Sequence, residues 1–145
     1  ASTLSFHATK VFHTIEGGAI VFNEADKFNR AKGLINFGIN NGEITEPGIN
    51  GKLNEYQCAV GLTILDDIDN IIEHRAHLFV AYQKALEGVV EMPKWLENVS
   101  YNGAYMPILL RAGDQRSKLI DTLSSAGIQS RKYFSPSTSI RQSFN

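Results

Sequence analysis

The first part of the chain alternates between short apolar runs and polar turns. Residues 4–6 and 19–22 are apolar and rich in residues that favour strands, and the pair Gly17-Gly18 predicts a turn before the second run. Apolar positions then recur at helical spacing through residues 24–37, with acidic residues at the start. Residues 38–51 are rich in glycine and asparagine and contain a proline. We therefore expect two strands, a helix and a loop, in this order.

A long helix is predicted to follow this loop. The side chain of Asn54 can accept a hydrogen bond from the first helical turn, and Gln57 can reach back to the backbone of Asn54, which is the pattern of a capping box. The helical pattern continues to Gly88, with a predicted break at Asp66-Asp67. One face of the helix is apolar and carries Ile64, Leu65, Ile68, Ile71, Ile72, Phe79, Tyr82 and Leu86. A helix of this length is expected to connect two lobes.

The last third of the chain predicts a small α/β lobe. Residues 105–110 form a predicted strand, in which Pro107 favours an edge or irregular position. Asp114 can cap a helix that ends at Gly127. The apolar face of that helix carries Leu119, Ile120, Leu123 and Ala126. Strand, helix and a further strand at residues 128–134 together are typical of an α/β arrangement.

The strand predicted at residues 128–134 alternates between two faces. Arg131 and Tyr133 are expected on one side, and Ser130 and Lys132 on the other. The chain stops in a polar segment without a closing element and begins close to a strand. We therefore expect the sequence to be a piece of a larger protein.

The composition is that of a soluble globular protein, because 43% of the residues are hydrophobic and 20% are charged. A net charge of -1 disfavours nucleic-acid binding. No apolar run approaches the ~20 residues that a membrane-spanning helix needs, and no signal peptide is recognised. Cys58 is the single cysteine, so an internal disulfide is excluded, and its apolar neighbours predict a packed thiol. We expect a cytoplasmic protein that has no nucleic-acid or membrane partner.

A metal site is not expected. Glu73, His74 and His77 share one face of the long helix, and this spacing is compatible with metal binding. No fourth ligand accompanies them, so a solvated polar face is the favoured interpretation.

Lys10 is the candidate catalytic residue. A lysine becomes a nucleophile when desolvation or a nearby positive group frees its amine, and it can then form a Schiff base with an aldehyde such as that of pyridoxal 5'-phosphate (PLP). Ser5 and the backbone at Gly17-Gly18 can supply hydrogen-bond donors for the cofactor phosphate. The spacing is compatible with such a site, but a solvated surface lysine remains the alternative.

Three motifs resemble one known family. Residues 5–10 read SFHATK and are followed by EGGA at 16–19. Residues 48–59 read GINGKLNEYQCA, and residues 131–136 read RKYFSP. Together, in this order and spacing, they resemble the DegT/StrS-type sugar aminotransferases. These are PLP-dependent enzymes of the aspartate aminotransferase fold, so the resemblance implies an α/β fold of the PLP-dependent transferase type I class.

The resemblance implies roles for residues of the first motif. Lys10 would hold PLP covalently and, once released, would move protons between the substrate and the cofactor. Ser5 would bind the cofactor phosphate. His7 would lie near the cofactor or the sugar substrate.

The other two motifs imply a dimer and a substrate site. Asn50 would reach across the interface of a homodimer to the cofactor phosphate in the partner's site. Arg131 and Tyr133 would lie in the small lobe, toward the substrate. Ser137, Thr138 and Ser139 stand where many members of the family have a substrate-binding histidine after the proline. We therefore assign no substrate histidine.

The resemblance also implies a division into domains. Residues 1–70 would be the end of the large PLP-binding domain, and residues 71–145 would be the linking helix and the start of the small C-terminal domain. In the family, the aspartate that pairs with the pyridine nitrogen and the group that stacks on the ring belong to a more N-terminal part. This chain alone is therefore not expected to run the reaction efficiently.

The implied function is transamination of a nucleotide-linked keto-sugar, with an amino acid, expected to be glutamate, as amino donor. The product would be an amino-deoxy sugar for polysaccharide or glycan biosynthesis, and the third motif favours a dTDP-linked substrate. Two alternatives stay open. A PLP-dependent sugar dehydratase would have histidine in place of Lys10, and a non-catalytic regulatory or binding relative would not need Lys10, Ser5 and Asn50 together.

Overall fold

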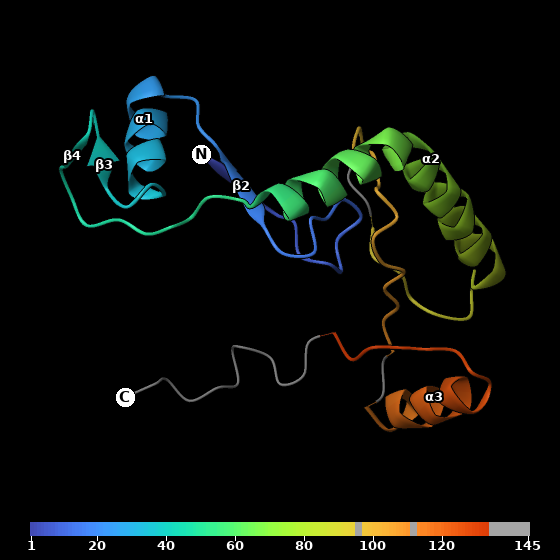
Figure 1. Cartoon of the computed structure of the whole chain (residues 1–145). Helices are drawn as coiled ribbons and strands as arrows, with labels where there is room; N and C mark the ends of the chain where they lie inside the picture. Colours follow the sequence, from blue (N-terminus) through green and yellow to red (C-terminus); the bar gives the residue numbers. More distant parts are fainter. Residues whose placement is uncertain (95–96, 111–112, 134–145) are drawn as a thin grey trace. The chain divides into compact units, whose positions relative to one another are not determined.

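The computed structural model describes residues 1–94, 97–110 and 113–133. These residues contain, in chain order, strands β1 and β2, helix α1, strands β3 and β4, and helices α2 and α3 (Figure 1). The chain divides into two compact units. One is Ala1–Ala85 with the described part of Trp95–Met106, and the other is Leu86–Lys94 with the described part of Pro107–Asn145. The division predicted between residues 70 and 71 stays a prediction.

The two strands predicted at the start of the chain are present and pair with each other. β1 (Ser2–Ser5) and β2 (Gly18–Val21) are antiparallel, with Ser2 opposite Val21 and Ser5 opposite Gly18. This register brings the ends of residues 6–17 together, because the chain leaves β1 and enters β2 at paired positions. The hairpin therefore presents residues 6–17 as one closed loop, which we call the lysine loop.

The helix predicted over residues 24–37 is α1, which spans Ala25–Leu34. It ends earlier than predicted because Phe37 and Gly38 adopt positive φ angles of 62° and 75°, which a helix cannot contain. A bidentate ion pair joins α1 to the following segment: Arg30 Nη2 lies 2.9 Å from Glu46 Oε2, and Arg30 Nε also donates to the same carboxylate. This contact ties the segment after the helix to its exposed face.

The prediction of a loop throughout residues 38–51 is wrong in part. β3 (Ile39–Asn40) and β4 (Glu43–Ile44) form a short antiparallel hairpin within it. The turn consists of Asn41 and Gly42, with φ angles of 50° and 86°. Positive φ at both positions is what a type I′ turn requires, and Asn-Gly is its preferred sequence.

The predicted capping box starts α2 (Glu55–Ala85). The backbone N–H of Gln57 donates to Asn54 Oδ1 at 2.9 Å, and the N–H of Asn54 donates to Gln57 Oε1 at 3.3 Å. The break predicted at Asp66-Asp67 is wrong, because the helix continues unbroken through these residues. Both aspartates are exposed, so their carboxylates are hydrated and do not compete with the helical hydrogen bonds.

Little of the apolar face of α2 is buried within the described residues. Phe79 is buried against Tyr101, with ring centroids 4.3 Å apart, and Arg75 Nη1 donates to the carbonyl of Gly103 at 3.1 Å. These contacts join residues 97–106 to the helix. The prediction of a packed thiol at Cys58 is wrong, because the thiol is exposed.

The second unit contains α3 (Gly113–Ser125), the predicted third helix. It ends as expected at Gly127, which has a φ of 73°. The N–H of Gly127 donates to the carbonyl of Ser124 and that of Ile128 to Leu123, which is the hydrogen-bond pattern of a Schellman motif. The side chain of Asp114, the predicted cap, lies outside the described part.

The prediction of strands at residues 105–110 and 128–134 is wrong for the residues that the structure describes. In 105–110 only Leu109 makes a strand-like bridge, to Glu91. Residues 128–133 contain no strand, and residue 134 lies outside the described residues. Pro107 cannot donate to a ladder, and β-prone residues form a strand only where a partner edge is available. No helix in the part of the chain described is long and apolar enough to cross a membrane.

Candidate functional site

The lysine loop is closed by backbone hydrogen bonds. The N–H of Phe6 donates to the carbonyl of Gly17, and the N–H of Thr14 donates to the carbonyl of Phe6, both at 2.9 Å. Within the loop, the N–H of Lys10 donates to the carbonyl of His7 at 2.9 Å, so Lys10 ends a tight turn. The bonds at its base extend the β1–β2 ladder and define where the loop begins and ends.

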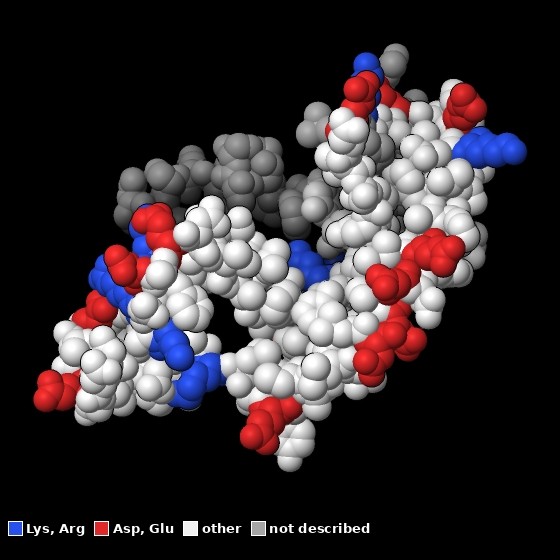
Figure 2. Space-filling model, turned by 90° about the horizontal axis from the view of Figure 1, so that it is seen from above, with Lys and Arg blue, Asp and Glu red and all other residues white. Residues whose placement is uncertain are grey.

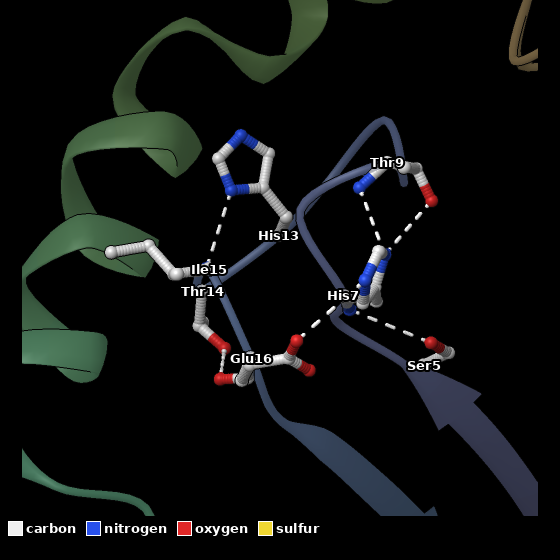
Figure 3. A network of polar contacts seen from close by, with 7 residues as sticks. All are labelled: Ser5, His7, Thr9, His13, Thr14, Ile15 and Glu16. Carbon is white, nitrogen blue, oxygen red and sulfur yellow. Dashed lines mark hydrogen bonds and ion pairs between the residues drawn. The ribbon is translucent and has the colours of Figure 1, made fainter.

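Helix α2 supports one side of the lysine loop. The rings of Phe6 and Phe12 pack edge to face with centroids 4.8 Å apart. Thr14 is only 2% exposed, and its hydroxyl donates to the carbonyl of Glu16 at 2.7 Å (Figure 3). Phe12 and Thr14 both lie against α2 at Gly61. The base of the loop is therefore held by hydrogen bonds and by contact with α2. Lys10 lies between the two ends of this base, in the tight turn that begins at His7.

The Lys10 side chain is exposed, and among the described residues its amino group has no hydrogen-bond or ion-pair partner. Ser5 stands at the end of β1, where its hydroxyl oxygen accepts a long hydrogen bond of 3.4 Å from the N–H of His7. The Ser5 hydroxyl hydrogen has no acceptor among the described residues. The loop thus presents an exposed amino group and a hydroxyl donor at the two positions predicted from the sequence. Their role in binding a cofactor stays a prediction.

His7 lies in a polar network with Thr9 and Glu16 (Figure 3). The N–H of Thr9 donates to His7 Nδ1 at 3.2 Å, and Thr9 Oγ1 lies 2.9 Å from the same nitrogen. Since Nδ1 accepts, the neutral ring carries its proton on Nε2, which lies 3.6 Å from a carboxylate oxygen of Glu16. Thr9 therefore orients the ring through Nδ1, and the Glu16 carboxylate lies near the other ring nitrogen.

Asn50 lies on a segment that is bound tightly to the end of α1. We call residues 46–52 the Asn50 loop. It pairs with residues 34–37 through a bridge between Asn36 and Asn50 and through backbone hydrogen bonds of 2.8–3.0 Å. Lys52 Nζ donates to Asn36 Oδ1 at 2.9 Å and lies 4.2 Å from the centroid of the Phe37 ring. This loop is therefore built to hold Asn50 at a defined place, and its predicted reach into a partner's site stays a prediction.

The remaining predicted site residues lie in the second unit. Arg131 and Tyr133 follow α3 in a segment without regular structure, and both are exposed. The alternation that placed them on one face of a strand does not apply, because no strand is present there. Their predicted role toward the substrate stays a prediction, and the rest of the third motif, residues 134–136, lies outside the described part.

Two features of the lysine loop were missed in the sequence. Ile15 has a φ of 66° and forms the centre of a γ-turn closed by the N–H of Glu16 and the carbonyl of Thr14, at 2.8 Å. This conformation is strained for a β-branched residue, and such strain is common at functional sites. The contact at Gly61 was also missed. A lone glycine within a helical pattern was the available signal.

Charged side chains of both signs lie on the face drawn in Figure 2. Figure 2 shows basic and acidic side chains both spread over the visible face, with uncharged surface between them. The hydrogen bonds from the Arg30 guanidinium hold the pKa of Glu46 below its ordinary value, and the same carboxylate raises the pKa of Arg30. Among the described residues, no group of three or more His, Cys, Asp or Glu is placed to hold a metal ion.

Two hollows lie between α1 and the β3–β4 hairpin, away from Lys10. One has a volume of about 240 Å³ and is lined in part by Arg30 and Glu46. The other has a volume of about 600 Å³ and is lined in part by Lys32 and Lys52. Lys10 lines neither of these two hollows, so the candidate site is placed by its exposed amino group.

Solved structures identify the class of protein. The chain superimposes on a DegT DnrJ EryC1 StrS aminotransferase from Brucella abortus with a TM-score of 0.86 and 25% identity, covering 96% of this chain and 37% of that one. It also superimposes on DesI, solved in the presence of its TDP-sugar product, with a TM-score of 0.81 and 31% identity, covering 92% and 36%. The fold is therefore the α/β, aspartate aminotransferase-like fold of the PLP-dependent transferases, of which this chain corresponds to one part.

The family follows from the sequence as a whole. The model of the DegT/DnrJ/EryC1/StrS aminotransferase family matches residues 1–145, and the chain belongs to this family. It is 37% identical over 142 residues to the dTDP-4-amino-4,6-dideoxy-D-glucose transaminase of Shigella dysenteriae. This alignment covers 93% of this chain and 38% of that protein. The chain spans less than two-fifths of the length of the curated relatives it matches.

Proposed function

We propose that this chain carries the cofactor-binding lysine of a PLP-dependent aminotransferase that acts on a nucleotide-linked keto-sugar. The observation that carries the proposal is the unpaired, exposed Lys10 amine on a loop whose base is fixed by hydrogen bonds and by contact with α2. Membership of an aminotransferase family supports PLP as the cofactor. The product would be an amino-deoxy sugar for polysaccharide or glycan biosynthesis.

The donor set of the loop fits PLP. A primary amine can hold the cofactor aldehyde, and a serine hydroxyl with an unused hydrogen can donate to its phosphate. When bound, PLP supplies an electron sink for the carbon that loses its proton. In this assignment Lys10 Nζ holds the cofactor and afterwards takes up and returns that proton, and Ser5 Oγ binds the phosphate. His7, held by Thr9 and close to Glu16, lies three residues before Lys10 and orients the cofactor or the sugar.

Cofactor trapping tests the assignment of Lys10. The intact protein is loaded with PLP, reduced with borohydride, digested, and its peptides are mapped by mass. We expect one pyridoxyl adduct, on Lys10, and its loss in Lys10→Arg. Lys27→Arg is the matched control. Lys27 lies on α1, is exposed like Lys10, and forms an ion pair with Glu24, which precedes the helix. An adduct on another lysine, or none on the wild-type protein, would overturn the assignment.

The substrate class rests on the relatives. The Shigella dysenteriae relative is a transaminase of a dTDP-linked sugar, and DesI was solved with a TDP-sugar product. These favour a dTDP-linked 4-keto-6-deoxy sugar as amino acceptor, with glutamate as the donor. Incubation with glutamate and either the dTDP-linked or the UDP-linked keto-sugar distinguishes the two nucleotides. Faster formation of 2-oxoglutarate with the UDP-linked sugar would contradict the dTDP assignment.

A homodimer is the second part of the proposal. Asn50 would donate to the phosphate in the partner's site, and the tight attachment of the Asn50 loop to α1 supports a fixed position for its amide. Mixing Lys10→Arg and Asn50→Ala subunits tests this. If Asn50 acts across a two-fold interface, random pairing restores about one site in four, so the mixture becomes more active than either variant alone. If both residues serve the same subunit, mixing restores nothing.

In this proposal the enzyme works in the cytoplasm, where its nucleotide-sugar substrate would be made. The dehydratase alternative is disfavoured by Lys10 itself. The non-catalytic alternative predicts no adduct in the trapping experiment, so the same measurement decides between it and the enzyme.

A further inference from the structure

Gly61 is a buried glycine within the first half of α2. Its backbone lies so close to the lysine loop that a Cβ atom at this position would stand 2.9 Å from Thr14 Cγ2 and 3.4 Å from Phe12 Cζ. The first distance is shorter than Cβ contacts in proteins, and the second is at the limit of ordinary packing. Glycine is therefore required here by the loop and not by the helix, since alanine is the better helix former.

The two residues that touch Gly61 control the rest of the loop. Thr14 donates from its backbone to the carbonyl of Phe6 and from its hydroxyl to the carbonyl of Glu16. Phe12 packs edge to face on Phe6. Lys10 lies two residues before Phe12, so a displacement at this contact moves the stretch of chain that carries its amine. Figure 3 shows α2, in green, beside this part of the loop.

We propose that Gly61 is a positioning residue for Lys10: the missing side chain lets Thr14 and Phe12 pack directly on α2, and this packing sets the place of the lysine amine. The inference rests on the proposed function of Lys10 as the cofactor-binding lysine. Gly61 touches neither cofactor nor substrate in this assignment. It acts through the loop.

The substitution Gly61→Ala tests the contact in the intact protein. Hydrogen exchange of the peptide covering residues 6–16 reports the packing of the loop, independently of activity. We expect exchange at Thr14 to rise about tenfold, which corresponds to about 1.4 kcal/mol. Exchange within α2 is not expected to rise, because alanine favours the helix. The fraction of Lys10 that carries a borohydride-trapped pyridoxyl group at limiting PLP is expected to fall about tenfold for the same reason.

A second substitution supplies the rescue. Thr14→Ser removes Cγ2, the atom that the new Cβ would meet, and keeps the hydroxyl that donates to Glu16. The double variant Gly61→Ala, Thr14→Ser is therefore expected to recover slow exchange and trapping at Lys10. Gly33→Ala is the matched control, since Gly33 is a helical glycine whose added Cβ would meet only the carbonyl oxygen of Ile39, at an ordinary 3.7 Å. It is expected to change neither measurement.

The outcomes separate the two proposals. If the wild-type protein forms no adduct on Lys10, the proposed function fails. If the wild-type adduct forms and Gly61→Ala leaves both exchange and trapping unchanged, the positioning role is wrong while the function stands. If Gly61→Ala lowers trapping but Thr14→Ser does not restore it, the Gly61–Thr14 contact is not the cause, and this overturns the inference as well.

Discussion

The capping box of α2 offers a direct test of how the helix after the Asn50 loop is held. The substitution Asn54→Ala removes the oxygen that accepts the N–H of Gln57 at 2.9 Å. That N–H lies in the first turn, where no helical carbonyl precedes it, so it loses its partner. The reciprocal hydrogen bond, from the N–H of residue 54 to Gln57 Oε1 at 3.3 Å, is expected to weaken because the first turn is then held less firmly.

The expected magnitude follows from the single strong bond. Replacing an asparagine cap by alanine costs about 0.5–2 kcal/mol, and the 2.9 Å contact on an exposed helix end places this case near about 1 kcal/mol. A loss of about 1 kcal/mol raises the population of the opened first turn about fivefold. The effect should be local, since α2 continues for thirty-one residues and its other contacts lie further along.

Amide hydrogen exchange at Gln57 measures this population. The control is Asn70→Ala, because Asn70 is an exposed asparagine of the same helix with no hydrogen-bond partner among the described residues. There the same side-chain change should favour the helix by up to about 0.7 kcal/mol. Asn54→Asp keeps the acceptor and should preserve protection. Unchanged exchange at Gln57 in Asn54→Ala, or an equal loss in Asn70→Ala, would refute the capping argument.

Two further predictions concern the Asn50 loop. Gly48→Ala should destabilise the loop by about 1–3 kcal/mol, because its Cβ would lie 2.6 Å from the carbonyl oxygen of Leu34. Urea unfolding would measure this, with Gly33→Ala as the control, since a Cβ at Gly33 would meet only the carbonyl oxygen of Ile39 at 3.7 Å. Because Arg30 lowers the pKa of Glu46 in the folded state, the pair stabilises the fold above the ordinary glutamate range and is lost as pH falls through the lowered pKa. In an NMR titration, Arg30→Met should return the Glu46 pKa to that range, and an unchanged pKa would contradict the pairing.

Elements that depend on neighbouring residues were predictable from the sequence. The capping box at Asn54 and the end of α3 at Gly127 both form as expected, because each rests on hydrogen bonds between residues a few positions apart. The two β-prone runs and the glycine turn before the second were predicted from nearby residues, whereas the pairing of β1 with β2 was not. The Asn41-Gly42 hairpin was equally local, and its signal was available but not used.

Elements that need a distant partner were not predictable. The β-prone residues 105–110 and 128–133 form no strand in the described chain, since a strand is stable only when its backbone groups pair with another. Cys58 was predicted to be packed from its apolar neighbours, but whether a helix face is covered depends on what lies against it. The continuity of α2 through Asp66-Asp67 has another cause: both carboxylates are exposed and leave the helical hydrogen bonds intact.

The sequence by itself determined which residues have the functional groups to bind the proposed cofactor. These are the Lys10 amine, the Ser5 hydroxyl and the Asn50 amide, which follow from residue type and motif. The tertiary structure decided how they are held. The lysine loop is closed by the pairing of β1 with β2 and rests on α2 at Gly61, some fifty residues further along the chain. Such a contact depends on the close approach of two backbones, and no local pattern of side chains specifies the distance between them.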